Sequence, residues 1–387
     1  MLMRAIFIIA LLCTAVIAQA APFVPADDRE VLQTLPEQRD PALAALKRLQ
    51  RASRGAPNDL AIATRYARGA IEASRATGDP RYLGQAQSAL APWWTVADAP
   101  APALLLRATV KQSLHDFEGA LRDLDRLLTS TPRDGQARLT RATVRTVLGR
   151  YADALADCDA LEGLAPALVT AVCRADVASR SGRAEEAYVL VTRALDGARV
   201  DAGVRAWAAT LAAEIAARRG DGPSAERHFR GALTLDPADP YALGSYADWL
   251  LDAGRPREAA ALLEAHARND GLLLRRVLAL RDLPDRDAYE AARIELAGRV
   301  DAARRRGDGV HRREEARYSL AIERDPAAAV KLARANWNVQ REPADLRILA
   351  ESARAAGDTS ALRIVSDWMS ATRLEDVRVQ SLLKGGA

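Results

Sequence analysis

The feature of this sequence that most constrains its fold is an internal repeat with a period of 34 residues. Small residues, a glycine, an aromatic residue and a proline return at matching places along the chain. The clearest matches join Ala108 with Ala142, Ala120 with Ala154, Pro132 with Pro166, Gly220 with Gly254 and Ala225 with Ala259. A repeat of this length is one supersecondary unit, which cannot bury its apolar face alone. The units must therefore stack side by side around a continuous core.

The residue types at the repeated places indicate that each unit is a pair of helices. Small side chains let the two helices approach closely, the glycine ends the first helix in a left-handed cap, and the proline begins the next helix. Composition agrees, because alanine, leucine and arginine dominate and aromatic residues make up only 5% of the chain. Such residues lose little side-chain freedom in a helix. We therefore predict an all-α chain.

This pattern resembles the tetratricopeptide repeat (TPR) family, which has the same period. The resemblance implies a right-handed superhelical solenoid of antiparallel helix pairs. The pattern is regular over residues 101–270, degenerate over 21–100 and 271–376, and leaves a tail at 377–387. Residues 325–343 also resemble a segment of exported proteobacterial TPR proteins of unassigned function.

The first twenty residues have the three parts of a secretory signal peptide. Arg4 gives the positive start, residues 5–17 form an apolar stretch, and Ala18-Gln19-Ala20 is an A-x-A cleavage site. We expect residues 1–20 to be removed by cleavage after Ala20, which makes the mature chain periplasmic or secreted. The alternative is a membrane anchor, but the apolar stretch is shorter than the roughly 20 residues that span a bilayer. The membrane is then a partner only through the transient signal peptide.

Two cysteines, Cys158 and Cys173, remain after this cleavage. An exported protein meets an oxidising environment, in which disulfides persist. The expected turn near Pro166 lies midway between the two cysteines, which places both at the same height on adjacent antiparallel helices. We predict a disulfide, provided that the two Cα atoms lie within about 7 Å. The alternative is two reduced thiols that fill small core positions.

The sequence contains no phosphate-binding, dinucleotide-binding, nucleophile-elbow or zinc-protease motif. We therefore predict a protein that is not an enzyme and has no cofactor, catalytic residue or metal site. The nearest approach to a metal site is His311 with Glu314 and Glu315, which share one helix face. A metal-dependent protein that uses this region remains a remote alternative, because carboxylates near a helix N-terminus are favourable without a metal.

The charge balance argues against a nucleic-acid partner. The chain has 55 Lys and Arg against 51 Asp and Glu, a formal net charge of +4. Nucleic-acid-binding domains concentrate positive charge far more strongly. We therefore expect no nucleic acid among the partners.

The concave groove of a TPR solenoid is lined by the first helix of each pair, and the resemblance therefore gives candidates for partner binding. They are Gln112, Gln136, Thr143, Asp176, Trp207, Glu214, Arg218, Tyr241 and Asp248, with Thr109, Arg180 and Asp252 beside them. This mixed surface suits an extended peptide or a partner helix. We predict a periplasmic scaffold that binds a protein or peptide partner in this groove. The alternative is a binder of envelope polysaccharide or peptidoglycan, which exposed aromatic residues beside carboxylates would favour.

Overall fold

The computed structural model describes residue 27, residues 41–307 and residues 312–385, and these ranges are helical without a strand. The chain forms two compact units, Met1–Ala44 and Ala45–Ala387, and the account below concerns the second. The predicted signal peptide with its cleavage point after Ala20 lies outside the described residues, as does His311. None of the described helices is long and apolar enough to cross a membrane.

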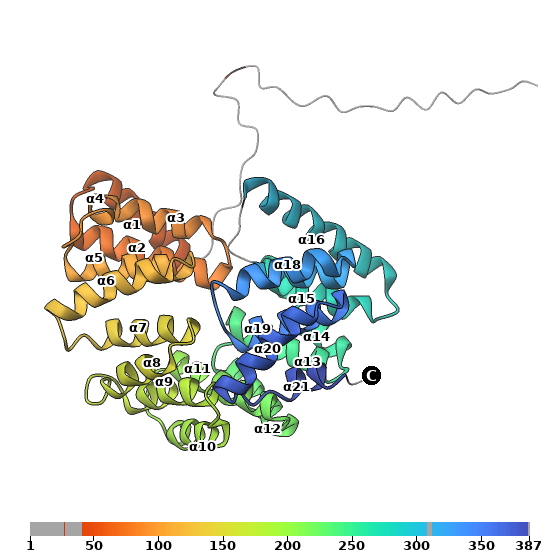
Figure 1. Cartoon of the computed structure of the whole chain (residues 1–387). Helices are drawn as coiled ribbons and strands as arrows, with labels where there is room; N and C mark the ends of the chain where they lie inside the picture. The colour runs from red at the N-terminus through yellow and green to blue at the C-terminus, as the bar shows by residue number, and fades with distance from the viewer. Residues whose placement is uncertain (1–26, 28–40, 308–311, 386–387) are drawn as a thin grey trace, which may run out of the picture. The chain divides into compact units, whose positions relative to one another are not determined.

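Antiparallel helix pairs follow one another along the second unit (Figure 1). The helix α1 (Pro41–Gly55) precedes them. The pairs are α2 (Leu60–Thr77) with α3 (Arg81–Ala89), α5 (Ala101–Ser113) with α6 (Phe117–Ser130), α7 (Gly135–Val147) with α8 (Tyr151–Asp159), α9 (Ala167–Ser179) with α10 (Ala184–Leu195), α11 (Ala202–Arg219) with α12 (Gly222–Leu235), α13 (Pro240–Asp252) with α14 (Pro256–Leu262), α15 (Asp270–Arg281) with α16 (Arg286–Arg306), α17 (Arg312–Tyr318) with α18 (Pro326–Trp337), and α19 (Pro343–Ala356) with α20 (Thr359–Thr372).

Shorter elements complete the second unit. They are α4 (Ala91–Trp94), a 3₁₀ turn η1 (Glu264–His266), a π-helical turn η2 (Ser319–Glu323) and the last helix, α21 (Val377–Leu383). The all-α, TPR-like solenoid predicted from the repeat is confirmed.

Most of the longer helices begin at an aspartate that caps them. The side chain of Asp116 accepts a hydrogen bond from Gly119 N, and Asp134 does the same for Ala137 N one repeat later. Such a cap satisfies one of the backbone N–H groups that the first helical turn leaves open. The turn glycine Gly220 ends α11 with φ 83°, a left-handed conformation that a side chain would strain. Local sequence thus sets where the helices begin and end.

The small residues of the repeat lie at the contact between paired helices. Ala120 and Ala154 are fully buried, as are Ala108 and Ala225. On the same helix as Ala154, Ala156 points to the exposed face. The same substitution at Ala154 and at Ala156 therefore separates the effect of the helix contact on stability from the effect of helix propensity.

We predict that Ala154→Leu lowers the free energy of unfolding by about 1–3 kcal/mol, because it overpacks the contact between α7 and α8. Ala156→Leu adds the same atoms on the exposed face, and its effect should stay within about 0.5 kcal/mol. Chemical denaturation of both variants measures the difference. Equal losses at the two positions would contradict the assignment of the repeated small residues to the helix contact.

In each of two consecutive repeats, a buried ion pair joins the first helix to the second. Arg107 on α5 donates to both carboxylate oxygens of Asp123 on α6, at 2.8 and 2.6 Å. One repeat later, Arg141 on α7 makes the same pair of bonds to Asp157 on α8, at 2.9 and 2.6 Å. Arg107 also donates to the main-chain carbonyl of Trp93, which fixes the turn at α4. Each ion pair is a bidentate, charge-assisted contact between the first and the second helix of one repeat.

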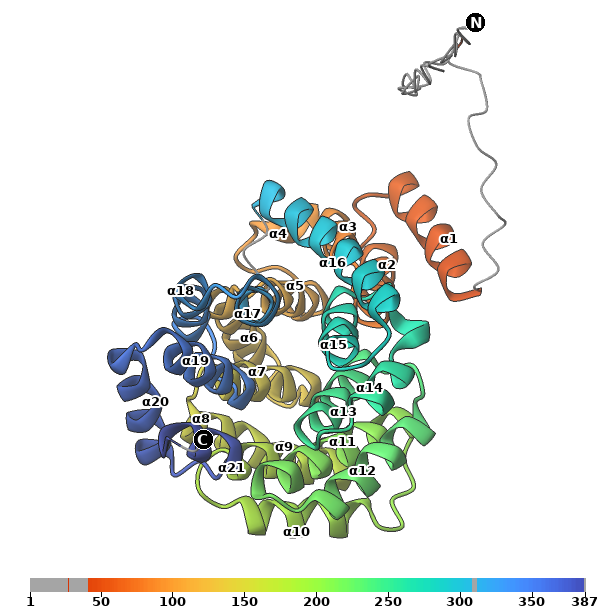
Figure 2. The same cartoon turned by 90° about the vertical axis from the view of Figure 1, so that its right-hand side faces the viewer.

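The C-terminal helices pack on the turns of the central repeats (Figure 2). Main-chain N–H of Arg341 donates to the carbonyl of Val147 at 2.8 Å. Three turn glycines of successive repeats lie beside residues of α20, α21 and the segment between them, namely Gly149 beside Trp368, Gly182 beside Arg373 and Gly220 beside Val377. The second unit therefore closes on itself, and its degenerate C-terminal repeats face its regular ones.

Cys158 on α8 and Cys173 on α9 form a disulfide in the structure. Their Cα atoms are 5.5 Å apart, inside the separation that the sequence argument required. Both side chains are buried in one apolar cluster with Ala154, Leu161 and Val177. The bond joins neighbouring repeats across the turn that contains Pro166.

Candidate binding site

The inner side of the second unit contains a cavity of about 600 Å³. Arg180 directly after α9 and residues from α11, α12 and α13 form one side of it, and residues from α15, α17, α19 and α21 form the other. Its charged lining consists of seven arginines, Arg180, Arg218, Arg275, Arg313, Arg317, Arg347 and Arg378, and seven carboxylates, Glu214, Asp248, Asp252, Glu314, Glu342, Glu351 and Asp376. Lysine, histidine and cysteine are absent from the lining of this cavity.

Part of the predicted groove lines this cavity. Four of the nine candidates do so, namely Glu214, Arg218, Tyr241 and Asp248, together with Arg180 and Asp252. The other five, Gln112, Gln136, Thr143, Asp176 and Trp207, lie outside its lining. Their role in binding stays a prediction. Sequence reasoning missed the opposite side, formed by Arg313, Glu342, Arg347 and Asp376 among others.

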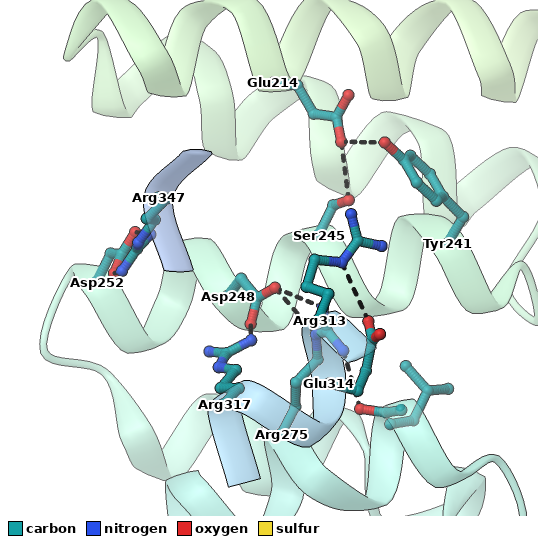
Figure 3. A network of polar contacts seen from close by, with 12 residues as sticks. Glu214, Tyr241, Ser245, Asp248, Asp252, Arg275, Arg313, Glu314, Arg317 and Arg347 are labelled. Carbon is teal, nitrogen blue, oxygen red and sulfur yellow. Dashed lines mark hydrogen bonds and ion pairs between the residues drawn. The ribbon is translucent and has the colours of Figure 1, made fainter. Parts of the chain in front are cut away.

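Asp248 joins the two sides of the cavity (Figure 3). It accepts hydrogen bonds from Arg275 Nε at 2.9 Å and from Arg317 Nη1 at 2.6 Å. Burial acts to raise the pKa of Asp248, but the two arginine charges outweigh it and hold the pKa at about 2. This carboxylate is therefore ionised at neutral pH and binds α13 to α15 and α17.

Asp252 makes the second connection across the cavity. Arg347 on α19 donates to both of its carboxylate oxygens at 2.5 and 2.7 Å, and also to Glu351 at 2.7 Å. Arg378 on α21 lies 3.8 Å from Asp252. These partners are 95 and 126 residues from Asp252 in sequence, so the contacts join helices that are distant along the chain.

The side chain of Asp345 stabilises the helices that form the C-terminal side of the cavity. Its fully buried carboxylate accepts bonds from Asn336 Nδ2 at 2.8 Å, Gln340 Nε2 at 3.0 Å and Glu342 N at 2.9 Å. Arg313 lies 3.4 Å from the same carboxylate and 3.1 Å from Glu342. Burial raises the pKa of Asp345 to about 6, against the lowering effect of Arg313. The network joins α17, α18 and α19.

Glu214 forms a polar cluster on the central side of the cavity (Figure 3). Tyr241 Oη donates to Glu214 Oε1 at 2.8 Å, and Ser245 Oγ donates to the same atom at 2.9 Å. Burial raises the pKa of Glu214, although the charge of Arg218 acts against this shift. The ring of Tyr241 is 56% exposed, so this cluster presents an aromatic face beside a carboxyl group.

Two arginines beside Glu214 keep N–H groups without an acceptor. Arg180 donates from Nε to Asp176 Oδ1 at 2.7 Å, while its Nη1 is buried and has no hydrogen-bond partner among the described residues. Arg218 donates from Nη2 to Ser179 Oγ at 2.9 Å, and its buried Nε has no acceptor in the same part of the chain. Buried donors of this kind are rare in folded proteins, because leaving them open is unfavourable.

The cavity has the chemistry of a binding site for a polar ligand. Its guanidinium, carboxyl and hydroxyl groups donate and accept hydrogen bonds, and none of its lining residues forms a nucleophile–histidine pair. Over the described ranges, no group of three or more His, Cys, Asp and Glu side chains is placed to hold a metal. The alternative metal site considered from the sequence used two carboxylates, and both lie near arginines. Glu315 accepts a hydrogen bond from Arg304 at 2.8 Å, and Glu314 lies 3.3 Å from Arg313.

Fold and cavity together define the class, a TPR-like helical solenoid whose inner side has a cavity with charged side chains in its lining. No protein-family model matches the chain, and a search of curated proteins gives no match.

Solved structures with similar folds exist. Human IFIT1, as a dimer with m7Gppp-AAAA, shares 13% identity with a TM-score of 0.50, covering 88% of this chain and 77% of that one. A thermophilic TPR protein of Thermus thermophilus, TTC0263, shares 21% identity with a TM-score of 0.39, covering 51% of this chain and 98% of that one. Yeast Tom70 shares 12% identity with a TM-score of 0.37, covering 89% and 92%. Likeness at this identity concerns the fold alone.

Proposed function

We propose that the chain is an exported scaffold that binds a protein partner through an extended peptide segment in the cavity. The observation that carries the proposal is the cavity itself, about 600 Å³ of space with charged side chains in its lining and ion pairs between distant helices across it. A preformed site loses little conformational freedom on binding, which favours affinity. The exposed ring of Tyr241 supplies an aromatic anchor of the kind that dominates many interfaces.

Other ligand classes fit the cavity less well. IFIT1 is found with m7Gppp-AAAA, but the cavity of this chain has as many carboxylates as arginines and so lacks the positive field that attracts RNA. An envelope polysaccharide remains the second candidate, because Tyr241 is exposed beside Glu214 and Trp207 is 37% exposed. A sugar ring would stack on such aromatic faces.

Site-specific photo-crosslinking tests the proposal. A photoreactive phenylalanine analogue replaces Tyr241 in the cavity, or Ile294 on the exposed face of α16 as the matched control. We expect crosslinks to a peptide segment of one protein from position 241 and none from position 294. Crosslinks to glycan alone would favour the polysaccharide candidate, and equal labelling from both positions would contradict the proposal.

Export is a separate part of the proposal, and we predict that it leaves a mature chain beginning at Ala21 or within one or two residues of it. The support is the positive start, apolar stretch and A-x-A site of residues 1–20. N-terminal sequencing of the protein from the periplasm or medium measures it. A cytoplasmic protein that still begins at Met1 would overturn both the compartment and the expectation of an oxidised disulfide.

A further inference from the structure

The segment from α1 to α4 carries an excess of positive charge. Residues 46–95 contain eight lysines and arginines against three aspartates and glutamates, whereas the whole chain has 55 against 51. Half of the eight lie on α1, which has no carboxylate, and all of these are exposed, namely Lys47, Arg48, Arg51 and Arg54. Spacings of three and four residues place Lys47, Arg51 and Arg54 on one side of the helix, the basic face of α1.

The basic face of α1 is exposed to solvent without an anionic partner. The buried residues of α1, Leu46 and Ser53, lie on a different side of the helix, and Leu46 packs against Gly69 on α2. Over the described ranges, the side chains of the basic face make no ion pair with a carboxylate. Like charges four residues apart on a helix repel each other, so a bound anion would relieve an unfavourable interaction.

A second cavity, of about 580 Å³, adjoins the basic face, and we call it the N-terminal cavity. Its lining comes from α1 to α4 and shares no residue with the cavity that Tyr241 lines. The charged members of this lining are Arg54, which belongs also to the basic face, and Arg81, which pairs with Asp79 at 2.6 Å. The other polar groups of the lining are neutral amides and hydroxyls, from Gln50, Ser53, Tyr66, Gln85 and Ser88.

Several of these neutral groups keep hydrogen-bonding capacity for a ligand. Tyr66 Oη donates to Gln85 Oε1 at 2.8 Å, which leaves the amide N–H groups of Gln85 without an acceptor in the described part of the chain. Burial raises the pKa of Tyr66, and a hydrogen bond from Gln50 and the charge of Arg54 act against this shift. The hydroxyl of Ser88, which is exposed, makes no hydrogen bond within the same ranges. Amide and hydroxyl groups next to an unpaired guanidinium fit a ligand with several hydroxyls and a negative charge.

We propose that the basic face of α1 and the N-terminal cavity together form a docking surface for an acidic polysaccharide. Carboxylates of the polymer pair with Lys47, Arg51 and Arg54, and one sugar unit enters the cavity, where its hydroxyls bond to the amides and hydroxyls of the lining. The inference goes beyond the proposed function, because it adds a second site that is separate from the cavity beside Tyr241. A scaffold of this kind holds a polymer at one place and a protein partner at another.

Other anionic partners match this surface less well. Helices that bind at a membrane surface insert large apolar side chains, and α1 as described has none that is exposed. Single-stranded nucleic acid stacks its bases on open aromatic rings, whereas the ring of Tyr66 in the N-terminal cavity is only 4% exposed. An acidic polypeptide has the charge but lacks the hydroxyls that the lining would bind. These partners are therefore outcomes of the test.

Binding of defined polymers to the full mature chain tests the proposal. The probe is polygalacturonate, whose sugar units each carry a carboxylate, and neutral dextran is the matched polymer without charge. Polyglutamate, single-stranded DNA and vesicles that contain phosphatidylglycerol represent the other partners. We expect polygalacturonate to bind most tightly and dextran not to bind, by calorimetry or, for vesicles, by co-sedimentation. Raising the salt from 50 to 200 mM should weaken polygalacturonate about tenfold or more, because binding to several charges of a polymer releases its counterions.

Charge variants locate the binding on α1. The triple variant Lys47→Gln, Arg51→Gln, Arg54→Gln should bind polygalacturonate about tenfold or more weakly, because it removes three charged contacts. The control removes three exposed arginines from α10, α14 and α20, by Arg193→Gln, Arg257→Gln and Arg363→Gln. Both triple variants have the same net charge, so the affinity of the control should stay within about twofold of the natural chain.

A separate variant tests the N-terminal cavity. Gly84 lines it on α3, and a side chain there meets no atom within 4 Å, so Gly84→Leu narrows the cavity without a clash. This variant should weaken polygalacturonate about threefold or more. Gly231→Leu on α12 is the control, because Gly231 is exposed and has equally open surroundings. Circular dichroism checks that each variant is folded, and the single variant Arg51→Gln serves if the triple variant is not.

Several outcomes overturn the proposal. They are equal binding of dextran and polygalacturonate, tighter binding of polyglutamate, DNA or vesicles than of polygalacturonate, equal losses in the two triple variants, or equal binding by Gly84→Leu and Gly231→Leu. None of these decides the proposed function, which is judged by the crosslinks from position 241. Peptide crosslinks from position 241 together with failed polymer binding would leave a peptide-binding scaffold whose basic face has no polysaccharide partner.

Discussion

Replacing Asp345 with alanine is expected to lower the free energy of unfolding by about 3–5 kcal/mol. The carboxylate of Asp345 is fully buried and accepts bonds from Asn336, Gln340 and the main chain of Glu342. Removing it leaves these buried donors without an acceptor, and it takes one partner from the Arg313 guanidinium. Denaturant unfolding followed by circular dichroism measures the loss.

Asp367 provides the control for this substitution. It lies exposed on α20, close in sequence to the same C-terminal repeats. Asp367→Ala should change the free energy of unfolding by no more than about 0.5 kcal/mol. A similar loss in both variants would mean that Asp345 is not the anchor of α17, α18 and α19.

The pH dependence of stability offers a second measurement on Asp345. Burial raises its pKa from 3.8 to about 6 in the folded chain. Between these values the folded state binds more protons than the unfolded state, so the contribution of Asp345 to stability decreases as the pH rises from about 4 to about 6. The variant Asp345→Asn cannot titrate there. The stability of the natural chain relative to this variant should therefore fall over that pH range, and an unchanged difference would contradict the raised pKa.

The sequence predicted the helix pairs well, even where the repeat is degenerate. Within residues 271–376, where the repeat is degenerate, the structure still has helix pairs, such as α15 at Asp270–Arg281 with α16 at Arg286–Arg306. The reason is local. Caps such as Asp285 and turn glycines such as Gly307 fix the helix ends without help from distant residues.

The cavity could be predicted only on its central side. Glu214, Arg218, Tyr241 and Asp248 occupy groove positions of regular repeats, which the period identifies. The opposite side, with Arg313 and the rest of the C-terminal lining, depends on how far the solenoid curls. Curvature is a sum of small rotations between neighbouring repeats, and no single residue pattern records it.

One structural feature did leave a signal in the sequence that we missed. Arg107 and Arg141 are 34 residues apart, and so are their partners Asp123 and Asp157. An opposite-charge pair that recurs at the repeat period, with one member on each predicted helix, identifies a contact within the helix pair. The ion pair with Asp123 explains why the Arg107 side chain is buried, although arginine is usually exposed.

Loss of the disulfide between Cys158 and Cys173 is expected to lower the free energy of unfolding by about 3 kcal/mol. The bond closes a loop with a sequence separation of 15 residues, and restricting a loop of about this length in the unfolded chain accounts for that magnitude. The double variant Cys158→Ala, Cys173→Ala removes it. Unfolding of the variant and of the natural chain, each with and without dithiothreitol, measures the effect.

Reductant distinguishes the bond from the packing of the two side chains. Both cysteines are buried in a cluster with Ala154, so alanine substitution also removes some apolar contact. Dithiothreitol should lower the stability of the natural chain towards that of the double variant and leave the variant unchanged. Thiol titration of the denatured, unreduced mature chain should find no free thiol. Two free thiols per chain, with a stability that dithiothreitol does not alter, would mean that the cysteines serve in the cell only as small core residues between α8 and α9.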